Sequence, residues 1–117
     1  MSTRYYRIQT ADRDVADLLD PEQQWSYSWC DEEREPRHGV SVCDSIEALA
    51  TYLAQCGIPY GDGEWVVVEV EGTFSRDEDE DAHLGALLVH PTAIVSVSPM
   101  GEGMFDLIGA AYDRLAA

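Results

Sequence analysis

The residues that could supply a nucleophile and a base are three cysteines and three histidines. Cys43 precedes a predicted helix start, where the helix dipole favours a thiolate, and His38 is close to it in the sequence. No cysteine-hydrolase signature surrounds it. The cysteines are spaced thirteen residues apart, so they form no short zinc knuckle. We therefore expect reduced structural thiols and assign no catalytic residue.

The densest charge is a run of five acids from Asp77 to Asp81. Its D-x-D-x-D spacing resembles a calcium loop, but the sixth position is Ala82 rather than glycine and the twelfth is Leu88 rather than glutamate. We therefore expect no metal site there. Two interpretations remain, a solvated loop or a docking surface for a basic protein. The docking surface would be formed by Asp77, Asp79, Glu80 and Asp81.

The whole chain is acidic, with 23 acids against 7 bases and a net charge of −16, and every base is arginine. Nucleic acid is a poor partner for such a chain because phosphate binding requires a basic surface. No apolar run approaches the roughly 20 residues of a membrane span, and the N-terminus lacks the apolar stretch of a signal peptide. We expect a cytoplasmic protein that binds neither membrane nor nucleic acid. The acidity suits solubility or docking to a basic protein.

The segment Gln24 to Cys30 alternates aromatic with small residues, which predicts a strand with one aromatic face. Such a face has two interpretations. It could pack as part of a core or lid, or it could form a stacking platform for a planar ligand. The aromatic residues concerned are Trp25, Tyr27 and Trp29.

A helix followed by a strand, between Gly39 and Gly72, forms the centre of the predicted fold. Asp44 and Glu47 have the spacing of a capping box at the helix start. The helix should present an apolar stripe formed by Ile46, Leu49, Ala50 and Leu53. Gly57 and Pro59 should end it.

The strand Glu64 to Glu71 should bury one face made of Val66, Val68 and Val70. Its other face ends in Glu69 and Glu71, which predicts that the strand emerges there at an edge or a cleft. These two glutamates share one face, so they could also act as paired carboxylates.

The remaining segments complete a mixed pattern of strands and helices. We expect a strand over Arg4 to Gln9, then a short helix over Arg13 to Leu19, capped by Thr10 or Asp12, with Val15, Leu18 and Leu19 inward. Two short strands, or one bulged edge strand, flank Pro91, because proline cannot donate to a ladder. A terminal helix should follow from Glu102 to Ala117, with an apolar stripe of Met104, Ile108, Ala111 and Leu115, joined by Phe105 and Tyr112.

The predicted fold is therefore α+β, a single domain over residues 1–117 with a mostly antiparallel, bent or split sheet and peripheral helices.

The runs GVSV, SIEALATYLA, VVVEVEG and ALLVHPTAIVSV are together similar to the core of the ADP-ribosyltransferase-like superfamily. In that superfamily a first strand carries Arg or His, and a second strand carries Ser or Tyr before a helix. The resemblance implies that Arg7 is the first-strand arginine and Ser41 the serine of a cleft for an NAD-like nucleotide. With the aromatic strand beside it, this cleft would be lined by Arg7, Ser41, Trp25, Tyr27 and Trp29.

One departure from the family pattern concerns its catalytic glutamate. That residue should fall near Gly85 or Ala86, and neither is acidic. Glu80 or Asp81 could replace it only if their loop folds back. The resemblance therefore implies a pseudoenzyme or a module that binds a nucleotide or a peptide, with weak or no catalysis.

The alternative function is an acidic interaction factor, such as an inhibitor, an immunity protein or an accessory subunit, that docks a basic partner. A metal-assisted enzyme using the acidic run ranks last. The orientation of Arg7 separates the first two hypotheses. A cleft position beside aromatic residues favours ligand binding, whereas an ion pair with Glu69 or Glu71 favours the interaction factor.

Overall fold

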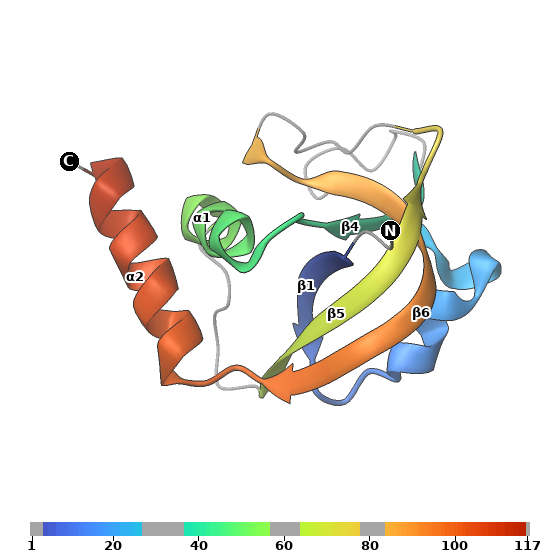
Figure 1. Cartoon of the computed structure of the whole chain (residues 1–117), viewed down its shortest axis with the longest axis horizontal. Helices are drawn as coiled ribbons and strands as arrows, with labels where there is room; N and C mark the ends of the chain where they lie inside the picture. Colours follow the sequence, from blue (N-terminus) through green and yellow to red (C-terminus); the bar gives the residue numbers. More distant parts are fainter. Residues whose placement is uncertain (1–3, 27–36, 57–63, 78–83, 117) are drawn as a thin grey trace.

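The computed structural model describes residues 4–26, 37–56, 64–77 and 84–116. Their elements, in chain order, are β1 (Arg4–Thr10), the 3-10 helices η1 (Val15–Leu19) and η2 (Pro21–Gln23), β2 (Trp25–Ser26), β3 (Arg37–His38), β4 (Val40–Val42), α1 (Ile46–Cys56), β5 (Trp65–Phe74), β6 (Leu87–Pro99) and α2 (Glu102–Ala116). These elements form one antiparallel sheet with two α-helices beside it (Figure 1), which confirms the predicted α+β class.

The main sheet has the strand order β1-β5-β6-β4, and each neighbouring pair is antiparallel. Its two outer strands meet again at a single bridge, where Tyr6 and Cys43 exchange two backbone hydrogen bonds of 2.8 Å. The sheet therefore curls until its edges touch, as Figure 1 shows. A second, two-stranded sheet pairs β2 with β3.

Strand β6 continues through Pro91 and lies inside the sheet, between β5 and β4. The prediction of two short strands is wrong, and the alternative of one bulged strand is confirmed. β4 pairs only with residues 87–89 of β6, so in the described part of the chain no strand flanks Pro91 on that side. The β5–β6 register shifts twice; at one shift Glu71 opposes Ala93 while Gly72 opposes Pro91, which leaves Thr92 as an extra residue. Such irregularities bend a strand and interrupt its ladder, so a proline that cannot donate is tolerated beside a bulge, beyond the segment of β6 that pairs with β4.

The two faces of the curled sheet bury two separate cores. The concave face is covered by η1 and contains a cluster of Tyr5, Leu18, Val40, Val42, Val68, Val70 and Val89. The other face packs against α1 and buries a cluster of Cys43, Leu49, Ala50, Leu53 and Met104. The predicted inward faces of β5 and α1 are therefore confirmed.

Both predicted helix caps are displaced. The N–H of Ala48 donates to Ser45 Oγ at 3.0 Å, so Ser45 rather than Asp44 caps α1. At η1 the cap is Asp14, whose Oδ1 accepts from Ala16 N–H at 2.9 Å, rather than Thr10 or Asp12. Serine and aspartate are both good caps, and the predicted choices were wrong by a few residues because neighbouring polar residues compete for the same role. Leu19, predicted to face inward, is exposed.

Helix α2 is the outermost element, separated from the sheet by α1 (Figure 1). Met104 and Ala111 are buried, whereas Phe105, Tyr112 and Leu115 are exposed. The predicted stripe is therefore correct only for the part that reaches α1. Among the described helices, none is long and apolar enough to cross a membrane.

Candidate functional site

A pocket of about 280 Å³ lies where β1 and β4 separate beyond the Tyr6–Cys43 bridge. Strand β1 and the turn after it form one wall, β4 and α1 the others, and the start of β5 closes it. The lining residues are Arg7, Ile8, Gln9, Thr10, Arg13, Ser41, Val42, Cys43, Leu49, Tyr52, Leu53 and Trp65. Most of them are apolar, so the arginines stand out as its charged groups.

Arg7 is the less exposed of the two charged groups of the pocket, since Arg7 is half-buried and Arg13 is exposed. Its Nε is buried and has no hydrogen-bond partner. Burial, and to a lesser extent the positive charge of Arg13, lower the pKa of the guanidinium to about 10, and Tyr52 partly offsets both effects. Arg7 nevertheless remains a cation at neutral pH. It is a half-buried positive charge beside an open pocket.

A second arginine is held at the pocket by the turn that follows β1. The backbone N–H of Arg13 donates to the Thr10 carbonyl at 3.2 Å. The buried side chain of Gln9 donates from Nε2 to the Arg13 carbonyl at 3.3 Å, and Ala11 N–H donates to the Glu64 carbonyl at 2.9 Å. These bonds tie the turn to the sheet, so the Arg13 side chain is presented from a fixed backbone.

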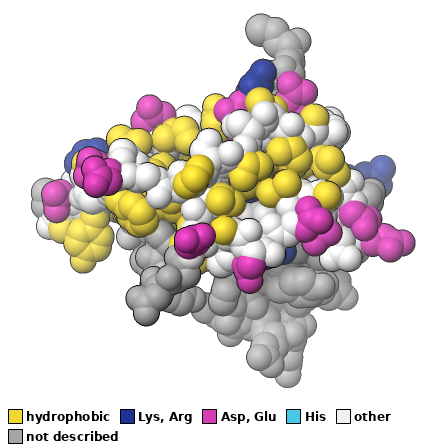
Figure 2. Space-filling view, turned by 90° about the horizontal axis from the view of Figure 1, so that it is seen from below, with side chains coloured by type: hydrophobic (Ala, Val, Ile, Leu, Met, Phe, Trp, Pro, Cys, Tyr) yellow, Lys and Arg dark blue, Asp and Glu magenta, His cyan; other side chains and the backbone are white. Residues whose placement is uncertain are grey.

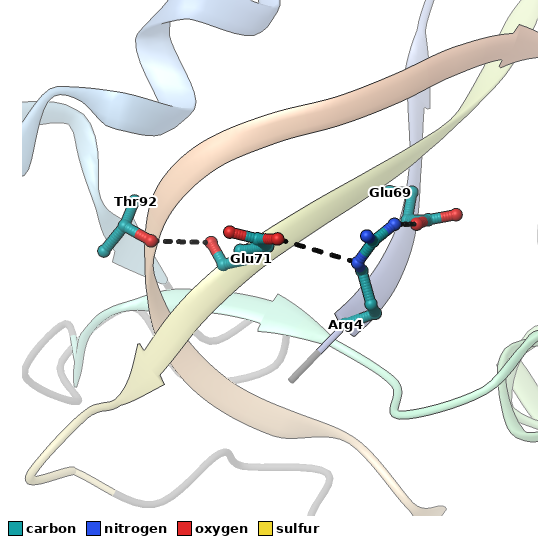
Figure 3. A network of polar contacts seen from close by, with 4 residues as sticks. All are labelled: Arg4, Glu69, Glu71 and Thr92. Atoms are coloured by element: carbon teal, nitrogen blue, oxygen red, sulfur yellow. Dashed lines mark hydrogen bonds and ion pairs between the residues drawn. The ribbon is translucent and has the colours of Figure 1, made fainter. Parts of the chain in front are cut away.

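The ion pairs in the described part of the chain both involve Arg4 and leave Arg7 out. Arg4 Nη1 lies 2.5 Å from Glu69 Oε2, and Arg4 Nε lies 3.7 Å from Glu71 Oε1 (Figure 3). The register explains this pairing, because Arg4 stands directly opposite Glu71 across β1 and β5. The two glutamates are thus engaged on an interior strand, and the predicted strand edge is wrong. Arg7 instead lies in the pocket with Ser41.

The predicted aromatic lining is described only in part. Trp25 is in β2, where its backbone pairs with His38, and the position of its side chain is outside what the structure describes. Tyr27 and Trp29 fall outside the described residues. The aromatic side chains that do line the pocket are Tyr52 from α1 and Trp65 from β5.

Of the predicted acidic docking surface, Asp77 is described, whereas Asp79, Glu80 and Asp81 lie outside the described residues. Asp77 Oδ2 accepts from His38 N–H at 2.8 Å, and its own N–H donates to Ser75 Oγ at 3.1 Å. Its carboxylate therefore ties the residues that follow β5 to β3.

A separate polar cluster surrounds the buried Gln24. Its Nε2 donates to the Leu18 carbonyl at 2.6 Å, so Oε1 faces His90 Nδ1 at 2.9 Å and accepts from it. Burial lowers the pKa of His90, the neighbouring His38 lowers it further, and Asp77 partly opposes both. This tie holds the loop before β2 to β6. No group of three potential metal ligands occurs among the described residues.

Sequence reasoning missed Arg13, Tyr52 and Trp65 as pocket residues. One available signal was composition, because Arg7 and Arg13 are two of only seven bases and flank a strand end. Tyr52 and Trp65 gave a weaker signal for a pocket position, since single aromatic residues in a helix or a strand usually belong to a core.

Comparisons of the chain with protein-family models, curated proteins and solved structures find no match. The resemblance to the ADP-ribosyltransferase-like superfamily stays a prediction.

Proposed function

We propose that this chain is a binding module for a compact organic anion that carries an aromatic ring, held in the pocket between β1, β4 and α1. The observation that carries the proposal is Arg7, a half-buried cation with a buried Nε that lines the pocket and has no ion-pair partner among the described residues.

A buried charge is unfavourable unless a counter-charge and hydrogen bonds compensate it. The chain has 23 acidic residues, so carboxylates that could pair with Arg7 are abundant in the sequence. The described acids instead lie outside the pocket lining, where Arg13 adds a second positive charge. A bound anion would supply the missing counter-charge and would raise the pKa of Arg7 toward its ordinary value. Arginine suits this role because its guanidinium can bind a carboxylate or a phosphate through two parallel hydrogen bonds.

The rest of the lining sets the shape of the ligand. Tyr52 and Trp65 offer aromatic faces, and the hydroxyls of Ser41 and Thr10 offer polar contacts. The volume of about 280 Å³ is just below the roughly 300–1,000 Å³ typical of small-molecule sites. It suits a ring with one anionic group, or one such end of a nucleotide, rather than a whole dinucleotide.

Weak or no catalysis follows from the absence of a suitable acid. The superfamily resemblance implies a catalytic glutamate near Gly85 or Ala86, and this chain has none there. No carboxylate is found among the described lining residues either. We expect no release of nicotinamide from NAD above background. Release by the pure protein that disappears in Arg7→Ala would overturn this part of the proposal.

The binding proposal is tested with three probes of similar size: phenyl phosphate, benzoate and the neutral benzyl alcohol. Intrinsic fluorescence reports binding, in a Trp25→Phe/Trp29→Phe background that leaves Trp65 as the remaining tryptophan. At least one anion should bind saturably and at least tenfold more tightly than benzyl alcohol. A charged hydrogen bond is worth about 1.5–3 kcal/mol, so Arg7→Met should weaken anion binding roughly 10- to 100-fold.

The matched control is Arg4→Met, which removes one arginine from the surface ion pair and leaves the pocket unchanged. It should bind the anion like the parent protein. Equal affinity for the anions and benzyl alcohol, or equal effects of the two arginine substitutions, would contradict the proposal.

A further inference from the structure

Helix α2 exposes an apolar line that nothing in the described chain covers. Phe105 and Tyr112 lie seven residues apart, two helical turns, and are 50% and 62% exposed. The neighbouring line, which contains Met104 and Ala111, is buried against α1. The apolar surface of α2 is therefore wider than the part that α1 covers, and its far side ends in Phe105 and Tyr112.

An acidic line runs beside these aromatic side chains. Glu102, Asp106 and Asp113 follow at four- and seven-residue spacing, which places them on one side of the helix, next to Phe105 and Tyr112. All three are exposed. Figure 2 shows hydrophobic and acidic side chains next to each other at the left end of the molecule, where α2 lies in Figure 1.

A glycine lies between the two lines. Gly109 falls between the aromatic pair and the acids, and a Cβ there would meet nothing within 4 Å. Glycine inside a helix is unfavourable by about 0.5–1 kcal/mol relative to alanine, and packing within the chain does not require it here. It leaves open space on the helix surface beside the two aromatic side chains.

The negative charge of this surface indicates which kind of partner could bind it. A second copy would bring another chain of net charge −16 against the same acidic line. An anionic membrane would be repelled for the same reason. A segment with its own apolar stripe, flanked by lysine or arginine, satisfies both the aromatic and the acidic line.

We propose that the outer face of α2, formed by Phe105, Gly109, Tyr112 and the flanking Asp106 and Asp113, docks an amphipathic basic helix of a partner protein. The proposal does not depend on the ligand pocket, which lies on the other side of α1. Phe105 and Tyr112 would anchor the apolar stripe of the partner, as aromatic residues do in many interfaces. The aspartates would pair with its lysines or arginines and speed association.

The test uses a fluorescein-labelled synthetic helix of leucine and lysine in amphipathic heptads, titrated with the full chain and followed by fluorescence anisotropy. A leucine–glutamate helix of the same pattern is the control peptide and should not bind. Phe105→Ser/Tyr112→Ser should weaken binding of the basic helix at least tenfold. Asp106→Asn/Asp113→Asn should weaken it at least fivefold and flatten its dependence on salt.

Because a chain of this charge attracts any basic peptide, the decisive control removes the same charge elsewhere. Asp17→Asn/Glu22→Gln changes two exposed acids near η1 and η2 and should leave the affinity within about twofold of wild type. Equal losses in the two charge variants would mean attraction by net charge alone and would overturn the proposal. The proposal would also be overturned if the wild type sediments as a dimer and the Tyr112→Ser variant sediments as a monomer. A second copy of the chain would then occupy this face.

Discussion

Replacing Arg7 by methionine should stabilise the free protein. Burial lowers the pKa of Arg7 to about 10, and a change of this size disfavours the charged side chain in the folded state by about 3 kcal/mol relative to water. Methionine keeps most of the apolar stem and has no charge to bury. Since the longer stem of arginine also packs, we expect a net gain of about 1–3 kcal/mol in the free energy of unfolding.

The assay is urea unfolding followed by far-ultraviolet circular dichroism at pH 7, without added anions. With a denaturant slope of about 1.5 kcal/mol per molar, the urea midpoint of Arg7→Met should rise by roughly 1–2 M. Arg13→Met, at an exposed position of the same pocket, should shift the free energy by no more than about 0.5 kcal/mol.

The pH dependence has a definite sign. The folded chain releases the Arg7 proton more readily than the unfolded chain, so the unfavourable effect is complete below pH 10 and shrinks as the pH rises above about 10. The gain in the free energy of unfolding of Arg7→Met over wild type should therefore shrink above about pH 10. A urea midpoint for Arg7→Met below that of wild type at pH 7 would contradict this account, because Arg7 would then hold the fold together through contacts of its own.

Three further predictions concern the framework of the fold. Leu49→Ala, at the centre of the buried face of α1, should lower the free energy of unfolding by about 2–5 kcal/mol; an unchanged urea midpoint would rule out the packing of α1 described above. Ser45→Ala should lower it by about 1 kcal/mol and Asp44→Ala by less, because Ser45 Oγ accepts from Ala48 N–H; the reverse order in thermal unfolding would restore Asp44 as the cap. Because the pKa of His90 is lowered in the fold, wild type should lose stability as the pH falls below its ordinary value of about 6.5. His90→Asn should lack that loss, so the difference in the free energy of unfolding between wild type and the variant should be smaller at pH 5 than at pH 7.5. A difference that is the same at both pH values would contradict this prediction.

The parts of the fold that follow from local patterns were predictable. The three- and four-residue spacing of Ile46, Ala50 and Leu53 is enough to indicate a buried helix face, and the alternating valines of β5 indicate a buried strand face. Both sit in the structure as expected. The cap was missed because two neighbouring residues, Asp44 and Ser45, are both good acceptors, and a shift of one residue decides which is used.

The parts that depend on pairing between distant strands were not predictable. The residues near Pro91 left two short strands and one bulged strand as alternatives, and only the pairing of β6 with β5 decides between them. Likewise, Arg4 and Arg7 lie in the same short strand, and only the register with β5 decides that Arg4 meets the glutamates. The pocket itself exists because the sheet curls until Tyr6 meets Cys43, which no local pattern encodes.

The most direct test of the central claim is whether an anion stabilises wild type much more than Arg7→Met and so narrows the difference in stability between the two proteins. Differential scanning calorimetry would compare both proteins with and without phenyl phosphate, or benzoate if that anion binds more tightly, at about ten times its dissociation constant for wild type. A ligand at that concentration stabilises the form that binds it by about 1.4 kcal/mol, or roughly 5 °C in a domain of this size. The midpoint of wild type should rise by that amount, and that of Arg7→Met should rise by no more than about 1.5 °C, because its binding is at least tenfold weaker. Equal shifts in both proteins, or none in wild type, would contradict the claim that the half-buried charge of Arg7 serves an anionic ligand.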